Sequence, residues 1–230
     1  MRQRSEDYSL KRASSLAWRS VSLDLDAERT AALNRYVVGP RVLDIGCGGG
    51  GFTDYLSRRG LQAAGVERAA ELLTIPMQKG LLGQYVRGDA LSLPFRDRSF
   101  DTTFLFDILE HLDDHAALAE AVRVTRRRVI ASVPLTVHPI VKAHGLLYYH
   151  YEDQTHLRTY TEASIAELFR KPSLEIVALH QILFLNFRDL LKGLLARRPG
   201  LIARGLLRMI DGFLAFQPLP TACIVVAERR

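Results

Sequence analysis

The segment Val42–Phe52, VLDIGCGGGGF, limits what this chain can fold into more than any other stretch. A short apolar run ends at Asp44 and Ile45, and five glycines occupy the next six positions. Glycine permits positive φ and lacks the Cβ atom that would keep a ligand away from the backbone. The segment therefore predicts a buried strand and a loop that opens a helix N-terminus, where free N–H groups can face a ligand. A plain tight turn would need only one or two glycines.

Short apolar runs alternate with helical patterns along the rest of the chain. Strands are predicted at 41–45, 61–67, 84–90, 100–106, 128–135, 174–181 and 221–229, and helices at 51–60, 69–80, 113–125 and 161–170. Asp113 is placed to cap the third of these helices, and Thr161 opens the fourth. This alternation predicts an α/β fold with a doubly wound, mostly parallel sheet covered on both faces. Ligands of such sheets bind at the carboxyl ends of the strands.

Composition narrows the class of protein. A length of 230 residues with 48% hydrophobic residues fits one globular domain. Two cysteines, Cys47 and Cys223, are too few for a disulfide framework or a zinc site. The polar N-terminal segment lacks the apolar core of a signal peptide, and no apolar run reaches the ~18 residues of a membrane span. We therefore expect a cytoplasmic protein.

The positive charge is unevenly placed, with one excess before residue 20 and a second one in a late segment. Lys and Arg exceed Asp and Glu by 31 to 25, a net charge of +6, and residues 182–220 contain six basic residues against two acidic ones. Phe187, Leu190 and Leu191 begin an apolar stripe with helical spacing, and a second stripe begins at Leu206. Residues 182–220 are thus predicted to be a basic amphipathic helical insertion between the last two strands. Two interpretations stand: a helical pair packed on the domain, or a peripheral contact with anionic lipid or a lipid-linked acceptor.

The glycines fit two kinds of ligand. Gly46, Gly48 and Gly51 satisfy the dinucleotide pattern G-x-G-x-x-G. Glu67, at the end of the second predicted strand, can accept both hydroxyls of a ribose in either case. The glycines alone do not decide between a dinucleotide and another nucleoside.

Two acidic positions favour a nucleoside with a cationic tail. Asp44 directly precedes the loop, so it would repel a pyrophosphate and hold an ammonium group, directly or through water. Asp89 ends the third predicted strand and can accept a hydrogen bond from the amine of an adenine. S-adenosylmethionine, an adenosine with a cationic amino-acid tail, satisfies Asp44, Glu67 and Asp89 together.

Four motifs in register carry a family resemblance. They are VLDIGCGGG, GVE, GDALSLPF and FDTTFLFDILEHLDD, and they lie within residues 42–114. In these motifs the chain resembles class I S-adenosylmethionine-dependent methyltransferases of the type-11, ubiquinone-biosynthesis-like group. The resemblance implies a Rossmann-like seven-stranded sheet with one antiparallel strand. It also implies S-adenosyl-L-methionine as cofactor and S-adenosyl-L-homocysteine as product.

The resemblance further implies which residues surround the cofactor. Asp44 and the glycines would line the methionine side, Glu67 would bind the ribose, and Asp89 with Ala90 would meet the adenine. Asp107 follows the fourth strand, where residues of the family close over the cofactor. The expected cofactor-binding set is Asp44, Ile45, Gly46, Cys47, Gly48, Gly50, Glu67, Arg68, Asp89, Ala90, Leu91, Asp107 and His111.

Methyl transfer from a sulfonium is an in-line displacement that requires mainly alignment and a desolvated nucleophile. A general base is needed only where the acceptor must lose a proton. His111 and His156 are the candidates, with a structural role near the cofactor for His111 and helix capping for His156 as the alternatives. Arg158 and Tyr160 are candidates for binding an anionic acceptor.

The run HYEDQTH suggests a metal site through His150, Glu152, Asp153 and His156. Nothing in the run fixes a tetrahedral geometry, and such polar runs are typical of loops. We therefore expect no metal here.

The predicted organisation is a single methyltransferase domain, residues 1–230. It comprises a helical lead-in (1–40), a cofactor-binding core (41–135), an acceptor-side region (136–181), the insertion (182–220) and the last strand (221–230). The predicted function is methyl transfer to a small-molecule, lipid or lipid-linked glycan acceptor.

Three other functions remain as alternatives: a non-catalytic S-adenosylmethionine-binding or scaffold protein, a nicotinamide oxidoreductase, and an RNA methyltransferase. Nucleic acid is the less favoured partner, because DILEH follows the fourth strand in place of the Asn/Asp-Pro-Pro-aromatic motif of base-amino methyltransferases. The sequence leaves the oligomeric state open.

Overall fold

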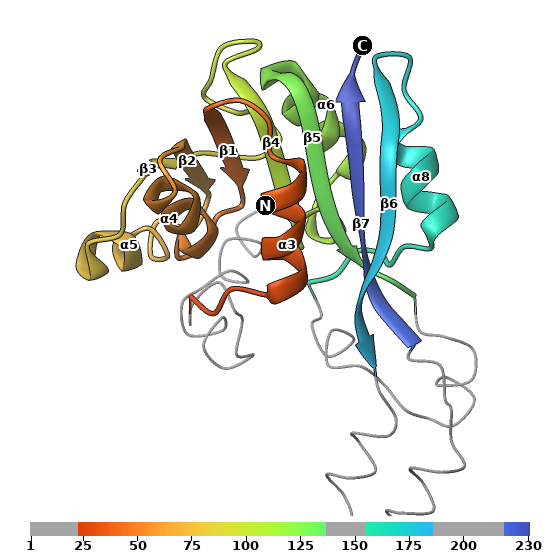
Figure 1. Cartoon of the computed structure of the whole chain (residues 1–230), viewed down its shortest axis with the longest axis horizontal. Helices are drawn as coiled ribbons and strands as arrows, with labels where there is room; N and C mark the ends of the chain where they lie inside the picture. The colour runs from red at the N-terminus through yellow and green to blue at the C-terminus, as the bar shows by residue number, and fades with distance from the viewer. Residues whose placement is uncertain (1–22, 137–154, 186–218) are drawn as a thin grey trace, which may run out of the picture.

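The computed structural model of the chain describes residues 23–136, 155–185 and 219–230 (Figure 1). The predicted amphipathic helices within 186–218 lie outside the described residues, as do residues 1–22 and 137–154. No helix in the described ranges is long and apolar enough to cross a membrane.

A seven-stranded sheet forms the centre of the domain. Its strands are β1 (Arg41–Ile45), β2 (Gln62–Glu67), β3 (Gln84–Arg87), β4 (Phe100–Phe106), β5 (Thr125–Pro134), β6 (Leu174–Leu185) and β7 (Leu219–Arg229). They lie in the order β3-β2-β1-β4-β5-β7-β6. The neighbouring pairs from β3 to β5 are parallel, and β7 runs antiparallel to both β5 and β6. The predicted fold class, with one antiparallel strand, is confirmed.

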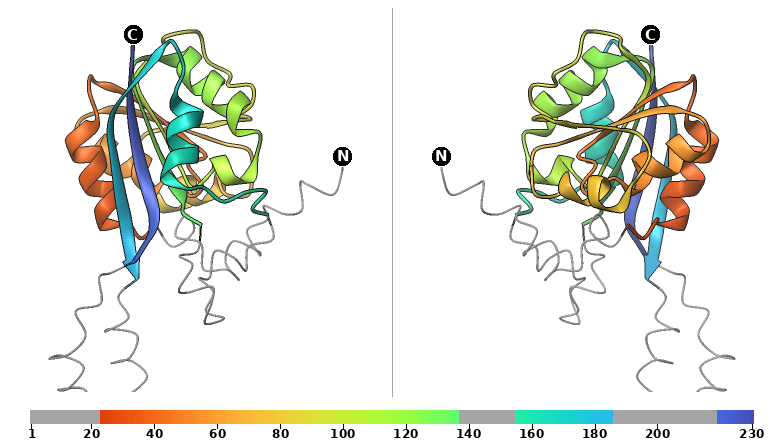
Figure 2. Two further views of the ribbon diagram at one scale, coloured as in Figure 1. Left: turned by 90° about the vertical axis from the view of Figure 1, so that its right-hand side faces the viewer. Right: turned by 90° about the vertical axis from the view of Figure 1, so that its left-hand side faces the viewer.

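Helices cover both faces of this sheet (Figure 2). The described helices are α3 (Ala27–Tyr36), α4 (Gly51–Arg58), α5 (Thr74–Lys79), the 3-10 helix η1 (Leu109–His111), α6 (Asp114–Val124) and α8 (Glu162–Phe169). Helices α3 and α4 pack with Val42 and Phe104 on one face. Helices α6 and α8 pack with Leu43 and Leu105 on the other face. Adjacent residues of a strand thus pack against helices on opposite faces of the sheet, so the strands are apolar along nearly their whole length.

The predicted helix starts are confirmed by their hydrogen bonds. Asp113 accepts the N–H of Ala116 at 3.0 Å and so caps α6. Thr161 accepts the N–H of Ser164 at 3.1 Å, and the Ser164 side chain accepts the Thr161 N–H at 2.9 Å. This reciprocal pair satisfies N–H groups that have no partner within the first turn of α8.

The last two strands extend further than predicted. Residues 182–185 and 219–220, assigned to the insertion from sequence, pair as strand. Ile182 lies opposite Ala222, and Leu185 lies opposite Leu219. Residues 182–185 were placed inside the insertion from sequence, but their backbone groups find partners on β7. The insertion is therefore shorter than the sequence suggested.

Arg229 near the C-terminus generates a first prediction. Its Nη1 donates to the carbonyls of Val122 at 2.6 Å and Thr125 at 2.8 Å, at the C-terminal end of α6. A cation that binds the last carbonyls of a helix stabilises it. Arg229→Ala should lower the free energy of unfolding by about 1–2 kcal/mol in urea titrations, since at least two hydrogen bonds are lost. Arg230→Ala is the control, because its pair with Glu175 is exposed. Equal effects of the two variants would contradict the assignment.

Candidate functional site

The parallel strands bring the predicted acidic residues to one edge of the sheet. Glu67 is the last residue of β2, Asp89 follows β3 and Asp107 follows β4. Ile45, at the end of β1, pairs with Val66 beside it. Residues far apart in sequence therefore lie at neighbouring carboxyl ends, as predicted.

The glycine loop lies over the ends of β1 and β2. The N–H groups of Gly46 and Cys47 both donate to the carbonyl of Val66, at 2.8 and 3.1 Å. Gly46 has φ of 78°, and a Cβ built there would lie 2.4 Å from the Ile108 side chain. Gly50 has φ of 85°, and its Cβ would lie 2.4 Å from the Tyr85 ring. These two positions favour glycine because of their positive φ, and the neighbouring side chains add crowding that the sequence did not reveal.

Glu67 fixes the conformation of this loop. Its Oε2 accepts the N–H of Gly48 at 3.1 Å, and its Oε1 accepts the N–H of Ala69 at 2.8 Å. The residue is half-buried. A carboxylate has about four acceptor positions, so two hydrogen bonds leave capacity for the hydroxyls of a ribose. Glu67 is therefore both a loop-positioning residue and a candidate ribose acceptor.

Asp44 is buried beneath the loop. It is only 4% exposed, and its Oδ2 accepts the Thr53 hydroxyl at 2.9 Å. Burial raises the pKa of Asp44 to about 7; the hydrogen bond from Thr53 opposes this and the Glu67 charge adds to it. With so little exposed surface, the carboxyl group would act on a ligand through the loop, by its field or by a bridging water.

Some of the other residues expected to bind the cofactor are exposed, and others are buried. Asp89 Oδ1 accepts the Leu91 N–H at 2.9 Å, and Leu91 is 40% exposed beside this carboxylate. An exposed apolar side chain next to an acceptor suits a flat apolar ring with a polar edge, as in adenine. Ile45, Cys47 and Ala90 are buried, so their side chains do not face a ligand. Arg68 is exposed.

Asp107 is exposed, but it pairs with a buried arginine that the sequence did not predict. Its backbone has φ of 53°, and its Oδ1 accepts from Arg29 Nη2 at 2.7 Å and from Ser132 Oγ at 3.1 Å. Arg29 lies on α3, is 4% exposed, and also contacts Asp26 at 3.4 Å. Burial acts to lower the pKa of Arg29, but the charges of Asp107 and Asp26 outweigh it and raise that pKa. Arg29 thereby fastens α3 to the carboxyl ends of β4 and β5.

A sequence signal for Arg29 did exist. Arg29, Ala32 and Leu33 are all buried and share the i, i+3, i+4 spacing of one helix face. A basic residue on an apolar helix face needs an acidic partner, and this pattern marks it as a candidate.

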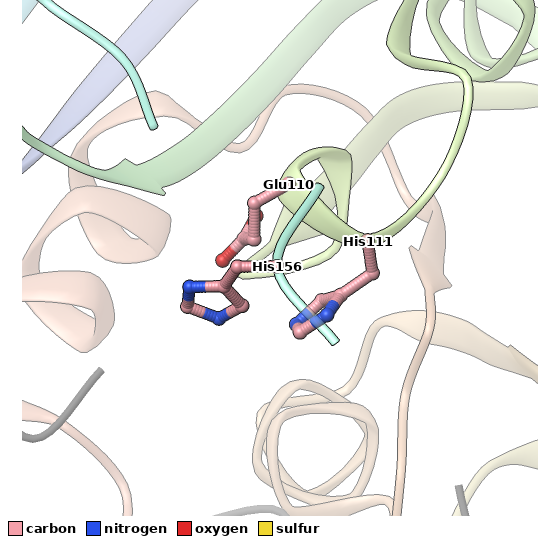
Figure 3. Close-up of side chains that lie close together, drawn as sticks. All are labelled: Glu110, His111 and His156. Atoms are coloured by element: carbon pink, nitrogen blue, oxygen red, sulfur yellow. The ribbon is translucent and has the colours of Figure 1, made fainter. Parts of the chain in front are cut away.

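The two candidate catalytic histidines lie together. The ring centroids of His111 and His156 are 4.6 Å apart in an edge-to-face arrangement. His111 Nδ1 lies 2.9 Å from the Thr155 hydroxyl. The Glu110 side chain lies beside them (Figure 3). The two histidines were predicted from sequence as separate candidates for a general base, and the fold brings them together in one cluster.

Arg158 and Tyr160 hold the chain that carries His156. Arg158 lies 3.1 Å from the Asp114 carboxylate. Tyr160 is 3% exposed, and its hydroxyl donates to Asp114 Oδ2 at 2.8 Å. Both side chains therefore position residues 155–160 against the start of α6, and acceptor binding by them stays a prediction. His150, Glu152 and Asp153 lie outside the described residues.

The fold and the acid-lined glycine loop together define a Rossmann-like domain of the methyltransferase type. A structure of a SAM-dependent methyltransferase from Thermotoga maritima, described as a possible histamine N-methyltransferase, superposes with a TM-score of 0.64. It is 17% identical in sequence, and the alignment covers 94% of this chain and 95% of that one. At this identity the likeness concerns the fold.

Sequence comparison gives the family. Residues 43–132 match the family described as a methyltransferase domain. An uncharacterized methyltransferase of Mycobacterium sp. (strain JLS) is 38% identical over 100 residues, which are 43% of this chain and 40% of the relative. A ubiquinone biosynthesis O-methyltransferase of Psychrobacter cryohalolentis is 31% identical over 104 residues, 42% and 39% of the two chains. The matches thus span about 40% of the length of these curated relatives. The predicted family is confirmed.

The raised pKa of Asp44 predicts a dependence of stability on pH. Between the ordinary pKa of 3.8 and about 7, the folded chain holds a proton that the unfolded chain has lost. The free energy of unfolding should therefore fall as pH rises through this window, by up to about 1.4 kcal/mol per pH unit from this group. Urea unfolding of the wild type and of Asp44→Asn at pH 5, 6, 7 and 8 measures it. The free energy of unfolding of the wild type minus that of Asp44→Asn should fall as pH rises toward 7, and a difference that does not change with pH would contradict the assignment.

Proposed function

We propose that this protein is an S-adenosylmethionine-dependent methyltransferase acting on a small-molecule, lipid or lipid-linked glycan acceptor. The hydrogen bond from Gly48 to Glu67 is the observation that carries the choice of cofactor. In a dinucleotide-binding loop such N–H groups face the pyrophosphate. Here the N–H faces a carboxylate, and Asp44 lies buried below. Negative charge at both places disfavours a diphosphate and favours a cation.

The cofactor would lie along the sheet edge from β1 to β3. Asp89 and Leu91 offer an acceptor and an apolar surface for the adenine, and Glu67 offers acceptors for the ribose. The ammonium group of the methionine part would lie over the glycine loop, above Asp44. When bound, S-adenosylmethionine supplies a methyl group on a sulfonium that needs no further activation.

The choice of acceptor class rests on two supports. One is the similarity to a relative named ubiquinone biosynthesis O-methyltransferase, a name that indicates transfer to an oxygen. The other is the basic, apolar composition of residues 182–220 in the sequence. That segment would cover the acceptor and contact a lipid surface. An intact set of carboxylates and glycines argues against the alternative of a non-catalytic scaffold, which has little use for them.

Ligand binding tests the cofactor assignment. Calorimetry should show that S-adenosylhomocysteine binds and NAD does not. The affinity for S-adenosylhomocysteine should rise about tenfold between pH 6 and pH 8, because its ammonium group favours the ionised form of a carboxyl group with a pKa of about 7.

Two matched controls accompany this measurement. Methylthioadenosine lacks the amino acid, so its affinity should not change with pH, and Asp44→Asn should remove the pH dependence for S-adenosylhomocysteine. Glu67→Gln should weaken both ligands by about tenfold through lost ribose hydrogen bonds. Binding of NAD in place of S-adenosylhomocysteine would refute the proposal.

Label transfer tests the acceptor class. The protein is incubated with a cell extract and S-adenosylmethionine labelled on its methyl group, and the products are partitioned between organic and aqueous phases. Label should enter the organic phase if the acceptor is a lipid or lipid-linked molecule. A chain lacking residues 186–218 should lose this transfer while it keeps its affinity for S-adenosylhomocysteine. Equal loss of transfer and of binding would contradict a role of the segment in acceptor binding.

A further inference from the structure

Glu110, His111 and His156 place three potential metal ligands together. One ligand atom from each residue lies within 4.8 Å of the others. Glu110 and His111 come from η1, and His156 comes from the segment that precedes α8 (Figure 3). Atoms that bind one ion at about 2.0–2.2 Å can be at most about 4.4 Å apart. Small side-chain rotations would therefore bring all three within reach of one ion.

Several contacts hold the two segments of this cluster in register. The Leu157 N–H donates to the Glu110 carbonyl at 2.8 Å. The Tyr160 hydroxyl lies 3.2 Å from the carbonyl of Leu109, and Arg158 is paired with Asp114. The ligand-bearing segments are thus fixed relative to each other, as a preformed metal site requires.

His111 is also oriented by a neighbour. The Thr155 hydroxyl lies 2.9 Å from His111 Nδ1. Imidazoles that bind metals commonly use one ring nitrogen for such a hydrogen bond and the other for the ion. Nε2 of His111 is accordingly the nitrogen that would bind.

From this geometry we infer that Glu110, His111 and His156 bind a divalent first-row transition ion. Two imidazoles and one carboxylate suit Zn²⁺, Fe²⁺ or Mn²⁺ and leave coordination positions open. An ion with open positions can bind an acceptor oxygen and ease the loss of its proton. The site was not predicted from sequence, where the metal interpretation used His150, Glu152 and Asp153 beside His156.

The position of the cluster gives the ion a role in the proposed reaction. Ile108, two residues before Glu110, packs against Gly46 of the glycine loop. An acceptor hydroxyl bound to the ion would release its proton to water. Its oxygen would then form the O–CH3 bond as the S–CH3 bond breaks, and the sulfonium would become a neutral thioether. This role rests on the proposed function, whereas ion binding itself does not.

Titration with Co²⁺ tests the ion site directly. Chelator-treated full-length protein is titrated while the visible absorption of bound Co²⁺ is recorded. One ion should bind per chain. His111→Ala and His156→Ala should each lower the affinity for Co²⁺ by about 100-fold or more. Even the loss of a residue that only hydrogen-bonds to a metal ligand lowers metal affinity by about 10–100-fold. Thr155→Val should lower it by about tenfold.

His115→Ala is the matched control, because His115 is exposed on α6 and is not one of the three ligands. Its Co²⁺ affinity should equal that of the wild type. The affinity of His156→Ala for S-adenosylhomocysteine should be unchanged, which shows that the variant is folded. Equal Co²⁺ affinity in the wild type and in the double variant of His111 and His156 would overturn the site.

A second measurement tests the role of the ion. Chelation should abolish label transfer to the extract acceptor, and added Mn²⁺ or Zn²⁺ should restore it. Transfer that persists after chelation would overturn the acceptor-binding role. Failure of S-adenosylhomocysteine to bind the wild type would instead refute the proposed function, so the two failures are distinguishable.

Discussion

The parallel pairing of β1 with β2 on one side and with β4 on the other determines where everything functional lies. The chain leaves β1 through the glycine loop into α4 on one face, and it leaves β4 through η1 toward α6 on the other. Loops that depart to opposite faces open a crevice at the carboxyl ends of the strands. Glu67 and Asp107 reach this edge because they end or follow a strand, whatever their separation in sequence, and Asp44, next to the last residue of β1, lies buried beneath the glycine loop. The order of the strands therefore determines where the site lies, and the side chains at the strand ends determine what it can bind.

Two buried ionisable groups near this edge, Arg29 and Asp44, differ in the partners that surround them. Arg29 has its counterions within the protein, since Asp107 and Asp26 both pair with it. Asp44 has the neutral Thr53 hydroxyl as its hydrogen-bond partner, and the charge that acts on it, from Glu67, is negative. A buried carboxyl group in this position binds a proton or attracts a cation. The cationic tail of S-adenosylmethionine is a ligand of that kind, and a diphosphate is not.

The sequence predicted the order of the seven strands, the caps of α6 and α8 and the acidic edge, because these follow from local periodicity and from residues next to strand ends, although several strand bounds differ by a few residues. It missed what depends on distant packing. Arg29 joins α3 to β4 and β5, the Glu110, His111 and His156 cluster joins η1 to the segment before α8, and residues 182–185 find strand partners only on β7. Gly46 and Gly50 were correctly identified as special, but the side chains that exclude a Cβ there belong to the protein itself.

Ile108 connects the two halves of the proposed site. Its side chain fills the space that a Cβ on Gly46 would need, and its backbone leads into η1, which carries Glu110 and His111. Ile108 thus places the glycine loop next to the turn that carries Glu110 and His111. Methyl transfer demands that donor and acceptor be aligned within fractions of an ångström. In the proposed reaction, the Ile108 side chain would help to keep the loop that binds the methyl donor in register with the cluster that binds the acceptor.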